Sequence, residues 1–568
     1  YTRYQYAARS VTLKRTSLAK YHAAQRAAVE PEWEEELCLT RDALGHLQSE
    51  QNHSGLWQYR HDAQGNLLQS RGPDGSTQNF LRYGSGHLLQ RSWQRGERQV
   101  EMAAYGRDRL HRELSRSQGP LTLETRYDPA GRIVMRRSAV LERRYLWDGL
   151  DQVTQQMLAS AEPDGSGPAF SQQRFGYDAA GQLTQRIAAG REERFSYDPA
   201  GNRTDTRGQV VWHNLLRRLK GARQEYDGFG RLAWRRAARG AAEQYFSYNA
   251  EHQLSEVRLS GHRAFSRVQY RYDALGRRTH KILHRHDEPD AEIMTFHWQG
   301  LQMVGEQSSR SPDHRVQYLY GEGGREPLAR VDIDGDSQQT FWYHTDLNGL
   351  PERLTDEEGD VVWRGRFSSW GETEYEGGGS RLAVPQNLRF QGQYLDRETG
   401  LHYNLFRYYD PVMGRFTQPD PVGLEGGLNP YAYAPNPLSW IDPLGLATCS
   451  VNTLRNARKN NHAISPSQRQ KIIDSIDNTK LKGIFSELYR PGANIPDGGT
   501  AASILHTKTT GQLVSGSDHI AKGTSYLEAL KRLTSGTGKY KGEVLIDSDR
   551  SLASYMMSDL KEALGFIP

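Results

Sequence analysis

The chain has 568 residues, more than one hydrophobic core usually organises, so at least two folding units are expected. Its composition is 36% hydrophobic and 10% aromatic, with 30 Tyr, which favours extended sheet rich in amphipathic rings over a compact aliphatic core. The two cysteines, Cys38 and Cys449, are too few for a disulfide framework or a cysteine-cluster zinc site. No stretch approaches the roughly 18 apolar residues that span a bilayer, so no membrane partner is expected.

A short motif, aromatic-Asp-x-x-Gly, recurs in the first half of the chain. A degenerate copy begins at His61, and clear copies begin at Tyr127, Tyr177, Tyr197, Tyr226 and Tyr272. The copies at Tyr177 and Tyr197 are 20 residues apart, and Tyr248-Asn249 adds another degenerate copy between Tyr226 and Tyr272. A period of this length indicates a repeat architecture.

The residue types in the motif suit a strand that ends in a tight turn. Tyr ends the strand with its ring on the sheet face, Asp accepts hydrogen bonds from turn amides, and Gly supplies the positive φ. Each copy therefore predicts one strand, one turn and one returning strand. Because a single repeat cannot bury its own face, the repeats are expected to stack into a continuous spiral.

These repeats resemble the YD-repeat family, which includes Rhs proteins, teneurins and the C subunits of insecticidal toxin complexes. The resemblance covers Tyr59 to Leu446 and is most specific at its end, where residues 400–424, 429–437 and 442–446 look like an Rhs core terminus. It implies a mainly β fold, in which a spiral YD-repeat β-cocoon shell precedes a small, mainly α toxin domain.

We expect three segments: a repeat β-shell over 1–390, an autoproteolytic core terminus over 391–446 and a toxin domain over 447–568. The usual N-terminal parts of the family do not precede Tyr1. The chain is therefore expected to be a fragment or a displaced locus.

Two aspartates, Asp420 and Asp442, each begin an Asp-Pro-x-Gly sequence. Either one alone is an ordinary turn signal. Together they match the pair that acts as an aspartyl protease in the Rhs and toxin-complex family, and Arg407 matches a family arginine. The resemblance thus implies self-cleavage between Leu446 and Ala447. Two adjacent carboxylates cannot both ionise cheaply, so one can polarise a peptide carbonyl while the other deprotonates water.

After Leu446 the repeats stop and helical signals begin. Apolar spacing and caps predict helices from Ser465, over 481–489, from 499–500, over 518–533 and over 551–564, with one strand at 543–546. This segment holds 16 Lys+Arg and 11 Asp+Glu, so the whole net charge of +5 lies in it. That bias suits a polyanionic target such as nucleic acid, although an ordinary soluble surface carries it equally well.

One constellation in this segment suits metal-free RNA cleavage. His506 and His519 can act as general base and acid, and Lys522 or Arg490 can stabilise a pentacoordinate phosphate. A ribonuclease without metal or cofactor is the first interpretation. Because a single His is more often a surface or hydrogen-bonded residue, three alternatives stay open: an ADP-ribosyltransferase, another non-nuclease toxin and a non-enzymatic binding module.

The resemblance also implies a biological setting. An Rhs effector is made in the cytoplasm of the producer, shelters its toxin inside the shell and enters target cells through a type VI secretion system. Its expected partners are spike or adaptor proteins of that system, a cognate immunity protein and nucleic acid as the toxin substrate. Interbacterial competition is the expected role.

Overall fold

The computed structural model describes most of the chain up to Ser450 and shorter stretches beyond it. The described residues are 2–16, 18–27, 29–84, 86–161, 168–206, 208–237, 241–322, 324–423, 427, 429–446, 449–450, 478–488, 519–535 and the single positions 473, 476, 504, 537, 540, 545, 549, 553, 556, 557 and 560.

Within the described residues, 17 strands form one antiparallel sheet in which each strand pairs with the next along the chain. These strands are β1 (Thr2–Ala7), β2 (Ser10–Arg15), β3 (Glu35–Arg41), β4 (Leu47–Asn52), β5 (Gly55–His61), β6 (Leu67–Arg71), β7 (Thr77–Tyr83), β8 (His87–Arg95), β9 (Arg98–Arg107), β10 (Glu113–Gln118), β11 (Leu121–Tyr127), β12 (Ile133–Arg137), β13 (Leu141–Trp147), β14 (Val153–Ala161), β15 (Pro168–Tyr177), β16 (Leu183–Ala188) and β17 (Arg191–Arg194).

A second antiparallel sheet has 15 strands among the described residues, again paired in chain order. Its strands are β20 (Arg218–Leu219), β21 (Ala222–Tyr226), β22 (Leu232–Arg236), β23 (Glu243–Tyr248), β24 (Leu254–Ser260), β25 (Phe265–Tyr272), β26 (Arg278–Arg285), β27 (Glu292–Gln299), β28 (Gln302–Ser308), β29 (Ser311–Tyr320), β30 (Pro327–Asp334), β31 (Ser337–Thr345), β32 (Pro351–Thr355), β33 (Val361–Phe367) and β34 (Thr373–Gly378). The short strands β18 (Ser196–Tyr197) and β19 (Arg203–Thr204) and the 3-10 helix η1 (Trp212–Asn214) connect the two sheets.

The predicted strand-turn-strand repeat is confirmed, and the turn at Asp227 shows its chemistry. One carboxylate oxygen of Asp227 accepts hydrogen bonds from the backbone N–H groups of Phe229 and Arg231, both at 2.9 Å. Gly230 has φ +76°, which a side chain would strain. The guanidinium of Arg231 then lies 4.5 Å from the ring centre of Tyr248 in the next repeat, a cation–π contact.

The motif tyrosines tie each repeat to the one before it. In six repeats the Tyr hydroxyl donates to a backbone carbonyl of the preceding hairpin, in the pairs Tyr127–Glu113, Tyr177–Val153, Tyr197–Leu183, Tyr226–Leu216, Tyr248–Leu232 and Tyr272–Leu254. The strand register also shifts directly before five motif tyrosines, Tyr127, Tyr177, Tyr226, Tyr248 and Tyr272. A bulge at each turn bends the strand and increases its twist, so regular bulges curve the sheets.

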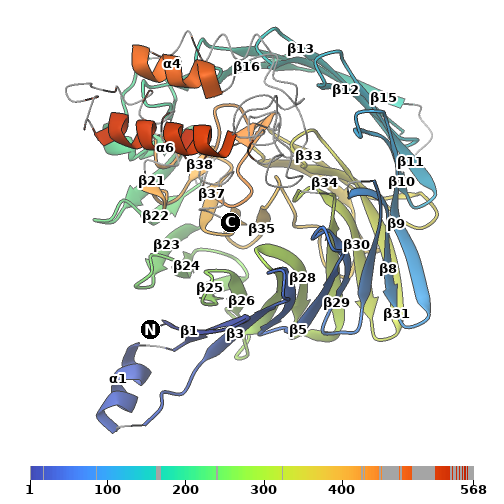
Figure 1. Ribbon diagram of the computed structural model, residues 1–568, viewed down its shortest axis with the longest axis vertical. Coiled ribbons are helices and arrows are strands. Elements are labelled where there is room, and N and C mark those ends of the chain that lie inside the picture. The colour runs from blue at the N-terminus through green and yellow to red at the C-terminus, as the bar shows by residue number, and fades with distance from the viewer. Residues whose placement is uncertain are drawn as a thin grey trace.

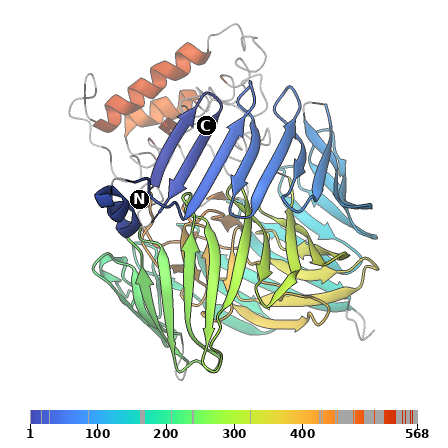
Figure 2. The same ribbon diagram turned by 90° about the horizontal axis from the view of Figure 1, so that it is seen from below.

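The two large sheets lie against each other, as Figures 1 and 2 show for the blue strands of the first sheet and the green to yellow strands of the second. The indole N–H of Trp93 in β8 donates to Gln317 in β29 at 2.8 Å, and that of Trp342 in β31 donates to the carbonyl of Met102 in β9 at 3.1 Å. Around them the buried apolar side chains of these strands form one cluster.

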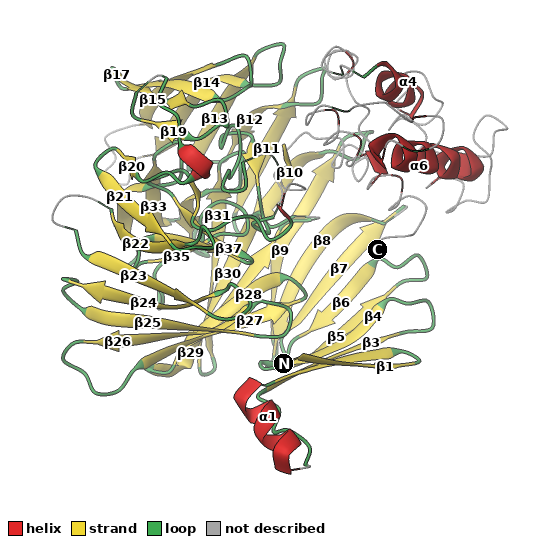
Figure 3. Cartoon of the chain, turned by 90° about the vertical axis from the view of Figure 1, so that its left-hand side faces the viewer, coloured by secondary structure: helices red, strands yellow, loops and turns green. Residues whose placement is uncertain are grey.

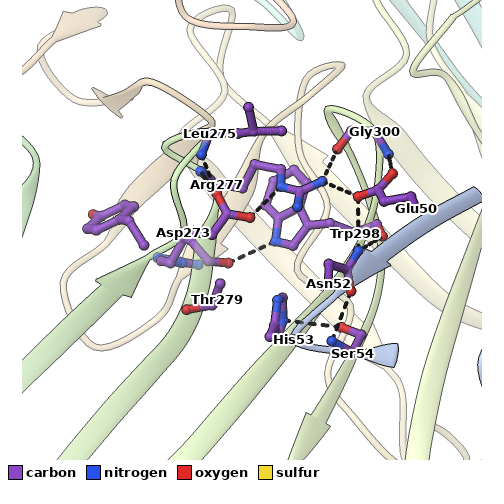
Figure 4. A network of polar contacts seen from close by, with 12 residues as sticks. Glu50, Asn52, His53, Ser54, Asp273, Leu275, Arg277, Thr279, Trp298 and Gly300 are labelled. Carbon is purple, nitrogen blue, oxygen red and sulfur yellow. Dashed lines mark hydrogen bonds and ion pairs between the residues drawn. The ribbon is translucent and has the colours of Figure 1, made fainter. Parts of the chain in front are cut away.

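A buried ionic network joins the sheets further along (Figure 4). The Arg277 guanidinium lies 2.6 Å from Asp273 in its own turn and 2.6 Å from Glu50 in β4 of the other sheet. Glu50 also accepts the N–H of Gly300 at 2.8 Å, and the amide of Asn52 donates to the Trp298 carbonyl at 3.1 Å. Because the charges are paired and hydrogen-bonded, their burial is tolerated.

A third, four-stranded sheet packs inside the curve of the second sheet (Figure 3). Its strands are β35 (Tyr394–Asp396), β36 (Leu401–Asn404), β37 (Arg407–Asp410) and β38 (Arg415–Phe416). Buried ion pairs at 2.6 and 2.7 Å, Arg278–Asp396 and Arg235–Asp410, fix it to the second sheet. The chain then forms β39 (Trp440–Ile441) and β40 (Cys449–Ser450), which pair with each other.

Three helices are described in full. α1 (Leu18–Ala27) interrupts the first sheet between β2 and β3 and was not predicted, although its Ala-rich sequence is a helix signal. The predictions over 481–489 and 518–533 are confirmed by α4 (Thr479–Leu488) and α6 (His519–Ser535). The helices predicted from Ser465 and from 499–500 and the strand at 543–546 lie largely outside the described residues, and only single helical positions of 551–564 are described.

The apolar side chains of α4 and α6 pack into a cluster that contains described residues from 473 onwards only. Figures 1, 2 and 3 show the two helices beside the sheets, not between them. The expectation that the shell encloses the tail is thus not met by these two helices, whose apolar faces pack among other residues of the tail. Among the described residues, no helix is long and apolar enough to cross a membrane.

The tie between repeats can be tested within one strand, because β23 carries two tyrosines in different settings. Tyr248→Phe removes the donor to the Leu232 carbonyl and should lower the free energy of unfolding by about 1 kcal/mol. Tyr245→Phe is the matched control: Tyr245 is 40% exposed, and its loss of a hydroxyl should change stability by less than about 0.5 kcal/mol. Urea unfolding followed by tryptophan fluorescence measures both, and equal effects would contradict the proposed role of the motif hydroxyl.

Candidate functional site

Arg407 brings together the two aspartates of the Asp-Pro-x-Gly sequences. One terminal nitrogen of its guanidinium lies 2.8 Å from Oδ2 of Asp420 and 3.3 Å from Oδ2 of Asp442. The three residues are 2%, 7% and 0% exposed, respectively. Three residues separated by up to 35 positions thus form one buried cluster, as the sequence analysis expected.

Local turns aim the two carboxylates. Asp420 follows β38, where its Oδ1 accepts the N–H of Val422 at 3.0 Å, and Asp442 follows β39, where its Oδ1 accepts the N–H of Leu446 at 3.0 Å. Each Asp-Pro-x-Gly sequence is therefore the ordinary turn that its composition predicts. In both turns Oδ2 remains for Arg407, so the turn and the cluster use different oxygens of the same carboxylate.

The guanidinium of Arg407 is held on several sides. It lies 3.7 Å from the ring centre of Phe416, donates to the Pro430 carbonyl at 2.9 Å and donates through Nε to the carbonyl of Gly445. Burial lowers the pKa of Arg407 below its usual range, while Asp420 and Asp442 act to raise it. Arginine stays charged even so, and the cluster keeps one fixed cation.

The carboxyl of Asp420 holds its proton more tightly than usual. Burial raises its pKa, Arg407 lowers it, and the neighbouring Asp442 raises it again. A cavity of about 430 Å³ opens beside Asp420, lined among others by Phe406, Gln418 and Pro421. A cavity of this size has room for water next to the carboxyl group.

The bond expected to be cut follows directly on this cluster. The N–H of Phe406 donates to the Leu444 carbonyl at 3.3 Å, so the turn between β36 and β37 runs beside residues 442–446. Gly445 has φ +69°, and a Cβ there would lie 2.5 Å from the carbonyl oxygen of Asn404. No other residue fits this approach without a shift. Residues 442–446 follow β39, which pairs with β40.

The residues predicted for the tail are mostly outside the described part of the structure. His506 and Arg490 lie there entirely, and His519 begins α6 with an undescribed side chain. Lys522 is described: its Nζ lies 3.7 Å from the Glu487 carboxylate and 5.8 Å from the Tyr526 ring centre. The phosphate-binding constellation therefore stays a prediction. No group of His, Cys, Asp and Glu able to hold a metal ion is found among the residues that the structure describes.

Sequence reasoning missed Asn404 as a neighbour of the cluster. Its side-chain amide donates to the main-chain carbonyl of Asp442 at 2.8 Å, and the residue is 0% exposed. Asn is depleted in strands, so an Asn at the end of an apolar strand was the available signal.

Comparison with known proteins agrees with this architecture. The family model described as Teneurin YD-shell matches residues 167–436, which include Arg407 and Asp420 but end before Asp442. Double-stranded DNA deaminase toxin A of Burkholderia cenocepacia is 38% identical over 72% of this chain and 30% of its own length. Toxin protein Tse5 of Pseudomonas aeruginosa is 32% identical over 72% of this chain and 36% of its own length. A probable deoxyribonuclease, RhsA of Dickeya dadantii, is 29% identical over 57% of this chain and 24% of its own length.

Among solved structures, the TcdB2-TccC3 complex superposes with a TM-score of 0.54 at 18% identity, covering 78% of this chain and 27% of that chain. This likeness shows a shared fold. The chain spans about a third of the length of the Burkholderia cenocepacia and Pseudomonas aeruginosa relatives. The repeats, the sheets and these matches together show that the chain belongs to the YD-repeat family of Rhs proteins.

The cluster predicts a particular pH dependence of stability. Arg407→Leu leaves two buried carboxyls without their cation and should destabilise the shell by about 3–5 kcal/mol at pH 7. The folded pKa of Asp420 is already raised, and it should rise further in the variant. A carboxyl whose pKa is higher in the folded than in the unfolded state makes the protein less stable as the pH rises from the unfolded pKa to the folded pKa. The stability that Arg407→Leu loses should therefore be smaller at about pH 4 than at pH 7.

Urea unfolding at the two pH values measures this difference. Adding Asp420→Asn and Asp442→Asn to Arg407→Leu should remove its pH dependence, because no ionisable carboxyl is left in the cluster. A deficit of equal size at both pH values would contradict the electrostatic account.

Proposed function

We propose that the chain is a toxin carrier that cuts its own backbone between Leu446 and Ala447. The observation that carries the proposal is the Arg407 guanidinium in contact with both Asp420 and Asp442, directly before the bond to be cut. Two carboxyls held close together, of which Asp420 has a raised pKa, are the equipment of acid–base peptide hydrolysis. The segments of this carrier are the repeat shell over 1–390, the cleaving segment over 391–446 and the toxin over 447–568.

In the proposed reaction the two carboxyls have different tasks. Asp420, whose pKa is raised, keeps its proton and donates it to the carbonyl oxygen of Leu446. Asp442 accepts a proton from the attacking water, which the cavity beside Asp420 can admit. The water oxygen bonds to the Leu446 carbonyl carbon, the C–N bond to Ala447 breaks, and the released amine takes up a proton. Arg407 keeps one carboxylate ionised throughout.

Self-cleavage predicts two species from purified full-length protein. The smaller should have the mass of residues 447–568 and should begin with Ala447, as intact mass spectrometry measures. Asp442→Asn and Gly445→Ala should each leave one species of 64.5 kDa, the first by removing the base and the second because a Cβ meets the Asn404 carbonyl. Gly261→Ala is a matched control, since Gly261 also has a positive φ, +78°, but open space around it and a place outside the cluster.

A single species from the unmodified chain would end the proposal. So would Asp442→Asn protein that still separates into two species after the same time.

For the released segment we propose an antibacterial toxin that acts on nucleic acid, with DNA as the target. Its basic balance, 16 Lys+Arg against 11 Asp+Glu, supports a polyanionic target. DNA replaces the RNA expected from the sequence, because one relative is named a double-stranded DNA deaminase toxin and another a probable deoxyribonuclease. Because DNA has no 2′-hydroxyl, water is the nucleophile in this proposal: His506 is the proposed base that takes its proton, His519 the acid that protonates the leaving oxygen, and Lys522 or Arg490 lies beside the phosphate.

The proposed setting follows from that activity. A DNA-directed toxin endangers its producer, so a cognate immunity protein is the expected partner in the producer's cytoplasm. Delivery through a type VI secretion system, with its spike or adaptor proteins, is the proposed route into target cells.

Expression of the full chain in bacteria without an immunity protein tests the target. Growth should stop, and chromosomal DNA should carry breaks or base changes while tRNA and rRNA stay intact. A variant with both His506→Ala and His519→Ala should grow. Lys522→Ala should also weaken the growth arrest. Lys531→Ala is its control and should not, because Lys531 lies on the same helix but pairs with Glu528 at 2.7 Å. Degraded RNA with intact DNA would contradict the DNA target.

A further inference from the structure

The buried side chain of Asn404 contacts Asp442, one of the two aspartates that Arg407 brings together. Asn404 and Arg407 pair across the hairpin that joins β36 to β37, so the two side chains leave one rigid turn. Asn404 Nδ2 donates to the main-chain carbonyl of Asp442 at 2.8 Å, while Arg407 contacts the carboxylate of the same residue at 3.3 Å. Asp442 is thus held at its backbone by one side chain and at its carboxylate by the other.

The orientation of the Asn404 amide is determined by its partner. A reversed amide would set its oxygen against the Asp442 carbonyl oxygen, two acceptors without a proton between them. In the orientation that satisfies Asp442, Oδ1 of Asn404 is buried and has no hydrogen-bond partner among the described residues. An unsatisfied buried acceptor is a cost to folding.

The contacts of Asn404 also restrain the segment that leads to the proposed cut. The backbone carbonyl oxygen of Asn404 is the atom that a Cβ at Gly445 would meet at 2.5 Å. The Asp442 carbonyl, which accepts from the Asn404 side chain, also accepts the N–H of Gly445 at 3.4 Å. A change in Asn404 would therefore move the Asp442 backbone, and with it the direction of the Asp442 carboxylate.

We propose that Asn404 is a positioning residue for self-cleavage: its hydrogen bond to the Asp442 carbonyl holds that carboxylate at the distance from Asp420 and from the Leu446 carbonyl that the reaction needs. This inference rests on the proposed self-cleavage. It assigns Asn404 no contact with the reacting atoms, since its effect passes through Asp442.

The test follows cleavage of full-length protein refolded from denaturant into a series of acidic to neutral buffers. Asn404→Ala should slow cleavage about tenfold or more, because a reaction barrier that rises by the free energy of one buried hydrogen bond lowers the rate by about that factor. Asn404→Asp should cleave slowly at neutral pH and recover as the pH falls, because a protonated Asp can again donate to the Asp442 carbonyl while an ionised one repels it. If Asn404 had only a structural role, the cleavage rate of folded Asn404→Asp protein would depend on pH in the same way as that of the unmodified chain.

Asn387 supplies the matched control. It is 6% exposed, lies beside the same four-stranded sheet and donates to the Tyr394 hydroxyl at 3.0 Å, away from the cluster. Asn387→Ala and Asn387→Asp should cleave with the rate and pH profile of the unmodified chain. The folded fraction is taken from circular dichroism and resistance of the shell to added protease, so that rates refer to folded protein.

The outcomes separate this inference from the proposed function. Unchanged cleavage in Asn404→Ala overturns the role of Asn404, as does an Asn404→Asp pH profile that coincides with that of the unmodified chain. If Asn404→Ala does not fold, the Asn404→Asp profile decides, and if neither folds while both Asn387 variants do, Asn404 is a folding residue and the inference is overturned. Cleavage that persists in Asp442→Asn would instead remove the proposed function itself.

Discussion

A single buried cation, Arg407, constrains everything around the proposed cleavage site. With both Asp420 and Asp442 ionised the cluster would carry a net negative charge in a place where at most 7% of any of the three side chains is exposed. Burying an unbalanced charge costs several kcal/mol, so one retained proton is the cheapest way to neutrality. Burial and the neighbouring Asp442 raise the pKa of Asp420, which is the direction that such neutrality requires.

The shell supplies the rigidity that this arrangement needs. Repeated turns, each with an Asp that binds backbone amides and a Tyr hydroxyl that binds the previous hairpin, build two large curved sheets. The second sheet holds the four-stranded sheet through buried pairs such as Arg278–Asp396, and that small sheet carries Arg407. The cluster lies where the last strands meet the wall, so the proposed cleavage requires a folded wall. The apolar side chains of the described tail helices pack in a cluster of tail residues alone.

The repeats were predictable from sequence because their chemistry is local: an Asp, a Gly with positive φ and a Tyr at fixed spacing make a turn wherever they occur. The convergence of Asp420 and Asp442 was predictable only through resemblance, since each taken alone is a turn and nothing local says that both reach Arg407. Three features escaped. The helix α1 interrupts a regular series, Asn404 donates to a backbone carbonyl that no motif records, and the hydrogen bond from Trp93 to Gln317 joins residues 224 apart. The tail stayed least predictable, because a His, a Lys and an Arg specify no reaction until their geometry is known.

The central claim is that water, activated by the carboxyl pair, opens the bond after Leu446. Refolding uncut chain, recovered unfolded from inclusion bodies, in water enriched in oxygen-18 and sequencing the fragments by mass spectrometry tests it directly. The account predicts a large fragment that ends at Leu446 with one heavy oxygen atom in its new carboxylate, and a small fragment that begins at Ala447 and carries none. Fragments with other ends, or a Leu446 carboxylate without the label, would contradict it.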